Sequence, residues 1–357
     1  MSLKHLDVDS VVNLPTIPKV EEEIMANWVG DTSKPLVSIV CHTYNHLDYI
    51  KNALDGFLMQ ETNFPFEIIL HDDASSDGTS EIVKSYAESY PNIILPIIQT
   101  TNQWSQGIKP SEVTFPKVRG KFIAFCEGDD FWCSKEKLRE QLEVLNQQDD
   151  VSVCFHSAIE INELTNNSSL ICNYSNVSKT IKAETIIIDR GGSMPTASLF
   201  FRSQYLDDII ETYRNAPIGD FFIQSYLALK GKVIFLPEPM SIYRRNAKGS
   251  WTSNQQDKTK QSLYYKEMIK AIDNFYGNVQ NFEHSQNLII PLVFYLKAYL
   301  LQNKKPIPLL RAYYEQVSSL EHFKKSEVTQ LLAKELQTML LKKAKYILSK
   351  RKNKHEL

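Results

Sequence analysis

From Leu36 onward, short runs rich in β-branched and aromatic residues alternate with segments whose apolar residues recur at helical spacing. This alternation is typical of βαβ units, in which parallel strands are joined by helices. Predicted strands lie at 37–44, 66–73, 93–98, 121–126 and 151–155, with a further run at 233–236. The sequence therefore predicts an α/β fold with a mostly parallel sheet flanked by helices.

The chain has 357 residues, a length typical of two domains. After about residue 258 the β-rich runs stop, and long segments of helical periodicity follow at 260–275, 285–302, 307–320 and 326–350. Residues 160–185 are polar and are expected to form a loop. We expect an N-terminal extension over 1–35, an α/β domain over 36–255 and a helical C-terminal module over 256–357.

The charges are nearly balanced, with 40 Lys and Arg against 42 Asp and Glu. A net charge of -2 gives no general attraction to nucleic acid, and we expect no nucleic-acid partner. Basic residues nevertheless concentrate between Lys342 and Lys354, beside an amphipathic helical pattern. This basic C-terminal helix leaves three uses open: peripheral contact with an anionic membrane, docking of another protein, or formation of a homodimer.

The five cysteines are odd in number and show no CxxC spacing, which argues against a disulfide framework and a zinc site. No apolar run reaches the ~20 residues needed to cross a bilayer. The N-terminus carries acids where a secretory signal needs a basic start and an apolar run. We therefore expect a cytoplasmic protein, and peripheral contact with the inner face of the cell membrane stays open.

Two predicted strands end in groups of acids, Asp72-Asp73 and Glu127-Gly128-Asp129-Asp130. In open α/β sheets, ligands bind outside the carboxyl ends of the strands. Carboxylates gathered there repel one another unless a cation holds them, and oxygen ligands favour Mg²⁺ or Mn²⁺ over zinc. The alternative is that the acids cap the helices that follow them, as we expect for Asp77 at the helix start near Thr79. For the two groups together, we interpret the pattern as a metal site.

Three motifs in this region resemble the family 2 glycosyltransferases, which have the GT-A fold. They are Val37-Ser-Ile-Val with Thr43-Tyr44-Asn45, the run from Asp72 to Thr79, and the run from Gly120 to Trp132. The match is continuous from about Leu36 to Val153 and fainter to about Thr252. It implies a Rossmann-like GT-A domain.

The resemblance also implies an activity, the inverting transfer of a hexosyl or N-acetylhexosaminyl group. The donor would be a nucleotide diphosphate-sugar, with a UDP-sugar favoured. The acceptor would be a hydroxyl of a saccharide or lipid-linked saccharide, in the assembly of surface polysaccharide or glycoconjugate.

The same resemblance implies roles for individual residues. Thr43, Tyr44 and Asn45 would line the nucleoside pocket, and Asp73 would accept a hydrogen bond from the imide of the base. In the run Glu127-Gly128-Asp129, Asp129 would bind Mn²⁺ or Mg²⁺ and Glu127 would face the ribose or the sugar. Glutamate at the first position departs from the commoner Asp-x-Asp, which leaves a direct metal bond from Glu127 open.

On the acceptor side, Asp220 at a predicted helix start resembles the family's general base. A free aspartate has a pKa of about 3.9, and partial burial beside Phe221 would raise it usefully; the alternative is a simple helix cap. Arg244 and Arg245, with Gly249-Ser250-Trp251 after them, resemble the family's closing loop, in which a basic residue meets the diphosphate. The metal-binding histidine that the family often places a few residues later is missing, since no histidine follows before His284.

Other classes fit less well. A sugar-nucleotide nucleotidyltransferase usually opens with a Gly-rich basic loop after the first strand, and the run from Thr43 to Leu47 is not one. A dinucleotide oxidoreductase would carry GxGxxG, which the sequence lacks. A non-catalytic carbohydrate-binding relative stays open as an alternative, although Asp73, Asp129 and Asp220 speak against it.

Overall fold

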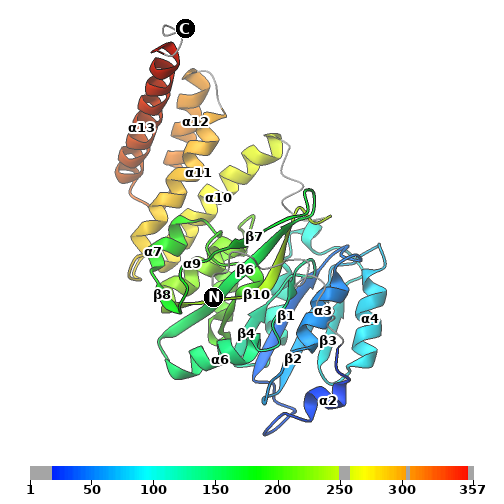
Figure 1. Cartoon of the computed structure of the whole chain (residues 1–357). Coiled ribbons are helices and arrows are strands. Elements are labelled where there is room, and N and C mark those ends of the chain that lie inside the picture. The colour runs from blue at the N-terminus through cyan, green and yellow to red at the C-terminus, as the bar shows by residue number, and fades with distance from the viewer. Residues whose placement is uncertain (1–17, 249–257, 303–305, 353–357) are drawn as a thin grey trace. The chain divides into compact units, whose positions relative to one another are not determined.

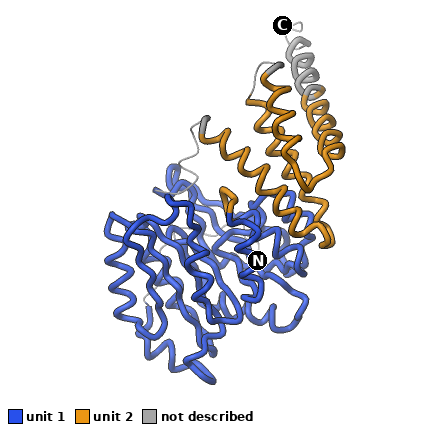
Figure 2. Tube along the Cα trace, turned by 180° about the vertical axis from the view of Figure 1, so that it is seen from behind, with its two compact units in different colours: residues 1–214, 220–256 blue, residues 215–219, 257–357 orange. Residues whose placement is uncertain are grey.

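A computed structural model describes residues 18–248, 258–302 and 306–352 of the chain (Figure 1). The chain divides into two compact units, coloured blue and orange in Figure 2. The first comprises Met1–Arg214 and Asp220–Gln256, and the second comprises Asn215–Gly219 and Asp257–Leu357.

Within the described residues of the first unit, ten strands form one sheet. The strands are β1 (Val37–Thr43), β2 (Phe66–Asp72), β3 (Ile94–Ile98), β4 (Phe122–Phe125), β5 (Phe131–Trp132), β6 (Val151–Asn162), β7 (Asn167–Ile171), β8 (Lys179–Ile181), β9 (Phe200–Arg202) and β10 (Lys232–Arg245). Their order is β3-β2-β1-β4-β9-β6-β10-β5, with β7 beside β6 and β8 beside β10. β1 to β4, β6 and β10 run parallel, and the others pair antiparallel. The expected α/β fold with a mostly parallel sheet is confirmed.

Helices connect and cover these strands (Figure 1). They are α2 (Glu21–Met25), α3 (Ile50–Leu58), α4 (Thr79–Ser89), α5 (Pro110–Thr114), α6 (Lys137–Gln147), α7 (Ala183–Ile188), α8 (Leu206–Tyr213) and α9 (Asp220–Lys230). Short 3-10 turns include η2 (Trp104–Gln106) and η4 (Thr196–Ser198). The apolar stripe of α3 is fully buried, as its spacing predicted. Gly56 on α3 permits a close approach, because a Cβ there would lie 2.8 Å from the carbonyl oxygen of Trp132.

The central strands explain why the acid groups of the sequence come together. β1 lies between β2 and β4, parallel to both, with Thr43 in register with Asp72. Parallel strands buried on both faces read as nearly continuous apolar runs, and Val37 to Cys41 are buried throughout. The residues that follow β1, β2 and β4 therefore emerge at one edge of the sheet, where the strand order switches direction.

Two segments differ from the sequence prediction. The polar region 160–185, expected to be a loop, contains β7 and β8, which pair antiparallel with β6 and β10. β7 is largely exposed, so no buried alternation marked it in the sequence. β10 is much longer than the predicted run at 233–236, because a shift in register between Leu236 and Ser241 lets it continue past two prolines.

Residues before β1 also pack on the first unit. Ile24 and Trp28 belong to its apolar core, and the Trp28 ring lies edge-on to Phe66 with centroids 5.4 Å apart. The carboxylate of Glu21 accepts hydrogen bonds from the backbone N–H groups of Asn92 and Ile93. This carboxylate joins α2 to the start of β3.

The second unit is helical, as the helical periodicity after about residue 258 predicted. It contains α10 (Lys258–Val279), the 3-10 turn η7 (Ser285–Leu288), α11 (Ile289–Leu301), α12 (Pro306–Ser318) and α13 (Lys325–Lys352). Its core includes Phe275, Leu296 and Leu332. The buried carboxylate of Asp273 accepts hydrogen bonds from the backbone N–H groups of residues 321 to 323, in the segment before α13.

The basic C-terminal helix belongs to α13, but its side chains from Lys342 onward lie outside the described residues. Membrane contact, one of the three uses left open for this helix, would fall on those side chains. In the part of the chain that the structure covers, no helix combines the length and apolar character required to span a bilayer.

Candidate active site

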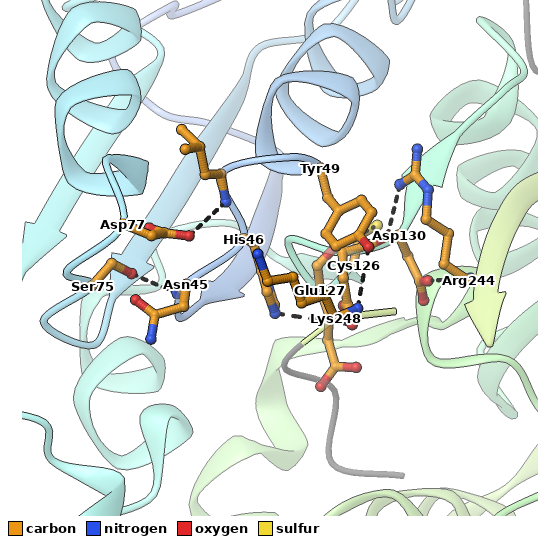
Figure 3. Close-up of polar contacts among 12 residues, drawn as sticks. Asn45, His46, Tyr49, Ser75, Asp77, Cys126, Glu127, Asp130, Arg244 and Lys248 are labelled. Atoms are coloured by element: carbon orange, nitrogen blue, oxygen red, sulfur yellow. Dashed lines mark hydrogen bonds and ion pairs between the residues drawn. The ribbon is translucent and has the colours of Figure 1, made fainter. Parts of the chain in front are cut away.

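The acid turn, Glu127 to Asp130, follows β4 at the edge where the strand order switches. It is tied to β1 by the Gly128 N–H, which donates to the carbonyl oxygen of His42 at 2.9 Å. It is tied to β10 by Arg244, whose backbone N–H donates to Asp130 Oδ1 at 2.8 Å and whose Nη1 donates to the Asp129 carbonyl at 2.7 Å (Figure 3). The turn is therefore fixed from both sides.

Gly128 is required for this arrangement. A Cβ at that position would lie 2.7 Å from Thr43 Oγ1 and 3.0 Å from His46 Nδ1. Distances this short force the neighbouring groups apart, so the turn packs against the end of β1 only with glycine between its acids. The backbone of the acid turn thus meets the Thr43-Tyr44-Asn45 segment directly.

The carboxylates of the acid turn crowd together. Oxygens of Glu127, Asp129 and Asp130 lie within 4.8 Å of one another. Burial, and then the charge of Asp129, raise the pKa of Asp130 well above its ordinary value. The pKa of Glu127 is also raised well above its ordinary value, first by desolvation from the surrounding protein atoms and then by the charge of Asp129. The Glu127 side chain nevertheless remains accessible to solvent. This donor set of carboxylate oxygens fits a hard divalent cation such as Mn²⁺ or Mg²⁺.

Asp220 joins this group from a different element. It begins α9, it is half-buried, and burial raises its pKa while a side-chain hydrogen bond with Thr196 of η4 opposes the rise. Its charge contributes to the raised pKa values of Glu127 and Asp130, so it lies within electrostatic reach of the acid turn. Asp220 of α9 is therefore an electrostatic neighbour of Glu127 and Asp130.

Asp73, by contrast, is hydrogen-bonded by backbone N–H groups of the loop after β3. Its buried carboxylate accepts the N–H of Gln103 at 2.7 Å on one oxygen and the N–H of Trp104 at 3.0 Å on the other. It therefore holds the start of η2, and each oxygen keeps a further lone pair for another donor. Sequence reasoning missed this loop, in which the exposed Trp104 ring lies 4.4 Å from Lys109 Nζ.

The Thr43-Tyr44-Asn45 segment is joined to the loop after β2. Asn45 adopts a left-handed conformation with φ 54°. Its N–H donates to Ser75 Oγ at 2.8 Å (Figure 3). Its side-chain oxygen accepts the N–H of Ser76 at 2.9 Å. Tyr44 is exposed, and the buried Thr43 Oγ1 has no hydrogen-bond partner among the residues that the structure describes.

The two arginines predicted to meet a diphosphate differ in their surroundings. The Arg244 guanidinium is buried over the ring of Phe131, with 4.6 Å to the centroid, and lies 3.5 Å from Glu163. Arg245 is more exposed and lies 3.5 Å from Glu160. Arg244 thus holds the acid turn, while Arg245 has the freer side chain. Gly249 to Trp251 of the expected closing loop lie outside the described residues.

His46 is a neighbour of the acid turn that sequence reasoning did not single out. Its Nε2 lies 3.9 Å from Asp129 Oδ2. Burial lowers the pKa of His46, while the charge of Asp129 opposes that change. The available signal was its position directly after Thr43-Tyr44-Asn45, at the end of a strand beside the acid turn.

Known proteins resemble this chain in sequence and in fold. The family model described as Glycosyl transferase family 2 matches residues 38–207. An uncharacterised protein of Mycobacterium tuberculosis is 35% identical over 225 residues, and the matched region spans 63% of each protein. A putative teichuronic acid biosynthesis glycosyltransferase of Bacillus subtilis, TuaG, is 32% identical over 124 residues, or 35% of this chain and 45% of that protein.

Among solved structures, residues 1–349 of S. aureus TarS in complex with UDP-GlcNAc match with a TM-score of 0.59 and 17% identity. The match covers 80% of this chain and 81% of the other. At this identity the likeness concerns the fold, and it confirms the expected GT-A architecture. The family match shows that residues 38–207 form a glycosyltransferase family 2 domain.

Proposed function

We propose that this chain is an inverting glycosyltransferase that moves a sugar from a nucleotide diphosphate-sugar to an acceptor hydroxyl. The observation that carries the proposal is the clustering of the Glu127, Asp129 and Asp130 carboxylates after β4, with Asp220 of α9 within electrostatic reach of Glu127 and Asp130. Direct displacement of this kind requires one base and stabilisation of the leaving group, with no covalent nucleophile.

Asp129 is the proposed metal ligand, with Mn²⁺ or Mg²⁺ as the ion. A bound divalent cation supplies a Lewis acid for the negative charge that develops on the nucleoside diphosphate. The crowding of the acid turn supports this role. Burial, and then the charge of Asp129, raise the pKa values of Glu127 and Asp130, and a bound cation would relieve the repulsive part. Glu127 remains accessible to solvent and is assigned to the ribose or the sugar.

Asp220 is the proposed general base. Burial raises its pKa toward the range in which a carboxylate takes a proton effectively at neutral pH. The Thr196 hydroxyl holds its carboxylate at the start of α9, so the group is oriented before an acceptor arrives. Asp220 then accepts the proton of the attacking hydroxyl as that oxygen bonds to the sugar carbon, while the bond from this carbon to the diphosphate oxygen breaks and the nucleoside diphosphate leaves.

We assign donor recognition to the residues at the carboxyl ends of β1 and β2. Asp73 keeps free lone pairs for the imide of a uracil base, and Tyr44 presents an exposed ring. Thr43, Asn45 and Gly128 form the adjoining wall, and Arg245 is the freer of the two arginines for a diphosphate. The UDP-GlcNAc of the TarS complex supports a UDP-sugar donor and hexosyl or N-acetylhexosaminyl transfer.

The name of TuaG supports a role in surface polysaccharide assembly, with a saccharide or lipid-linked saccharide as acceptor. A panel of nucleotide sugars, assayed for nucleotide diphosphate release with and without Mn²⁺, tests the proposal. We expect release from a UDP-sugar that depends on the metal and is accelerated by a saccharide acceptor. Release of pyrophosphate from a nucleoside triphosphate and a sugar phosphate would instead indicate a nucleotidyltransferase.

A further inference from the structure

His46 lies beside the acid turn and has no role in the function proposed above. Its imidazole is largely buried, with 11% of the side chain exposed. Its Nδ1 is enclosed and has no hydrogen-bond partner within the described part of the chain. The ring is therefore not held in place by the hydrogen bonds that usually satisfy a buried histidine.

The position of His46 is set by the backbone on both sides of the ring. Its carbonyl oxygen accepts the N–H groups of Tyr49 and Ile50, at 2.9 and 2.8 Å, and so starts α3. On the other side, its Nδ1 faces Gly128, where an added Cβ would lie 3.0 Å away. The imidazole is consequently fixed against the acid turn, with Nε2 3.9 Å from Asp129 Oδ2.

The distance between His46 and Asp129 fits a shared cation. At 3.9 Å, His46 Nε2 is too far from Asp129 Oδ2 for a direct hydrogen bond. A bridging water at ordinary hydrogen-bond lengths would hold two such atoms about 4.5 Å apart. Two donors that share one cation at about 2.1 Å lie between about 3.0 and about 4.2 Å apart.

We propose that His46 is a nitrogen ligand of the same cation as Asp129. This inference rests on the proposed function, because it assumes that the acid turn holds a divalent cation. It places the imidazole directly after β1, so the nitrogen ligand comes from the donor-binding edge of the sheet rather than from the chain after Tyr243.

A nitrogen ligand gives the site a metal preference. Imidazole binds transition-metal ions such as Mn²⁺ in preference to Mg²⁺, which favours oxygen donors. With His46 in place, the site therefore selects Mn²⁺ over Mg²⁺. Replacing it by glutamine keeps a polar side chain but removes the imidazole, so the preference for Mn²⁺ should weaken.

Electron spin-echo spectroscopy of the full chain with Mn²⁺ and UDP tests the inference without measuring activity. We expect ¹⁴N modulation from a directly bound nitrogen, which changes to a ¹⁵N pattern when the histidines are ¹⁵N-labelled. In His46→Gln the modulation should disappear and the affinity for Mn²⁺ should fall about 10- to 100-fold, with a smaller change for Mg²⁺. The matched control His284→Asn, in the second unit, should keep the wild-type spectrum and affinity.

The outcomes separate this inference from the proposed function. Mn²⁺ that binds in the presence of UDP without histidine ¹⁴N modulation would overturn the role of His46 and leave the acid turn as the metal site. Unchanged modulation in His46→Gln would also overturn it. Failure of the wild-type chain to bind Mn²⁺ with UDP would overturn both. The ¹⁵N-histidine spectrum of the wild type gives the answer even if His46→Gln does not fold.

Discussion

The acids after β2 and the acids after β4 look alike in the sequence but have different surroundings. Asp72 accepts hydrogen bonds from the hydroxyls of Ser75 and Ser80, and Asp73 accepts two backbone N–H groups. The carboxylates of the acid turn face one another instead, and the pKa values of Glu127 and Asp130 are raised. The acids after β2 thus accept hydrogen bonds that hold loops in place, whereas the acids after β4 form a cluster of negative charge.

The contrast shows where a cation is needed. A carboxylate that accepts several hydrogen bonds is stable as an anion, since its charge is already compensated. A carboxylate beside other carboxylates is stabilised by a proton or by a metal ion. By this criterion the acid turn is the metal site and Asp72 is a structural group, although the sequence interpretation treated the two acid groups as one site.

The largest expected effect comes from removing the charge of Asp129. Asp129→Asn should lower kcat by about 10⁴-fold, because the Lewis acid that stabilises the leaving group is worth several kcal/mol. The change should leave the unfolding free energy unchanged or higher, since it removes repulsion within the acid turn. Initial rates with saturating donor and Mn²⁺, together with thermal unfolding, measure the two quantities. A variant with near wild-type kcat would contradict the assignment.

Asp220→Asn should lower kcat by about 10³-fold, the range expected for loss of a general base. Affinity for the UDP-sugar and Mn²⁺ should change little, because the amide occupies the same volume and Asp220 is assigned to the acceptor. Calorimetric titration of the donor beside single-turnover kinetics separates the two. If donor affinity fell as far as the rate did, Asp220 would belong to the donor site instead.

Asp72→Ala should lower stability and leave kcat nearly unchanged, the reverse of the result expected for Asp129→Asn. Its loss leaves the hydroxyls of Ser75 and Ser80 without their acceptor, so the unfolding free energy should fall by about 1–3 kcal/mol. The kcat should remain within about threefold of wild type under conditions where the variant is folded, since this carboxylate binds no cation in our account. Chemical denaturation and steady-state rates check the two halves. Loss of Mn²⁺ binding in Asp72→Ala would erase the distinction between the two acid groups.

The pH dependence of stability gives a smaller effect with a definite sign. Because the folded chain raises the pKa values of Glu127 and Asp130, it binds more protons than the unfolded chain, and the unfolding free energy falls as pH rises above about 4. In Asp129→Asn this loss should be smaller, so the variant should gain stability over the wild type as pH increases.

Comparing wild type with variant cancels the contributions of His42 and His156, whose pKa values are lowered by burial and which act in the opposite direction. Melting temperatures measured without metal from pH 4 to pH 8 provide the comparison. A constant difference between the two proteins would argue against repulsion in the acid turn, and added Mn²⁺ should remove the pH-dependent part in the wild type.

The parts of the site that depend on residues close together in the sequence could be predicted from the sequence. Strand ends and helix starts follow from local patterns, and the cap formed by Asp77 on the N–H of Thr79 appears as expected. The edge at which the acids meet follows from the parallel order of β1, β2 and β4.

The remaining features depend on partners far along the chain. Asp73 is bound by N–H groups 30 and 31 residues later, and the acid turn is held by Arg244, more than 100 residues away. No local pattern indicates such contacts, so hydrogen-bonded and crowded carboxylates were indistinguishable in the sequence. The proximity of His46 to Asp129 likewise appears only when the loops after β1 and β4 are placed side by side.

The most direct test of the central claim is the position of the cation. Crystals grown with UDP and Mn²⁺, measured at a wavelength where manganese scatters anomalously, locate the ion independently of any activity. We predict a single strong peak within bonding distance of the Asp129 carboxylate. A peak beside Asp72 or Asp73, with none at the acid turn, would contradict the account.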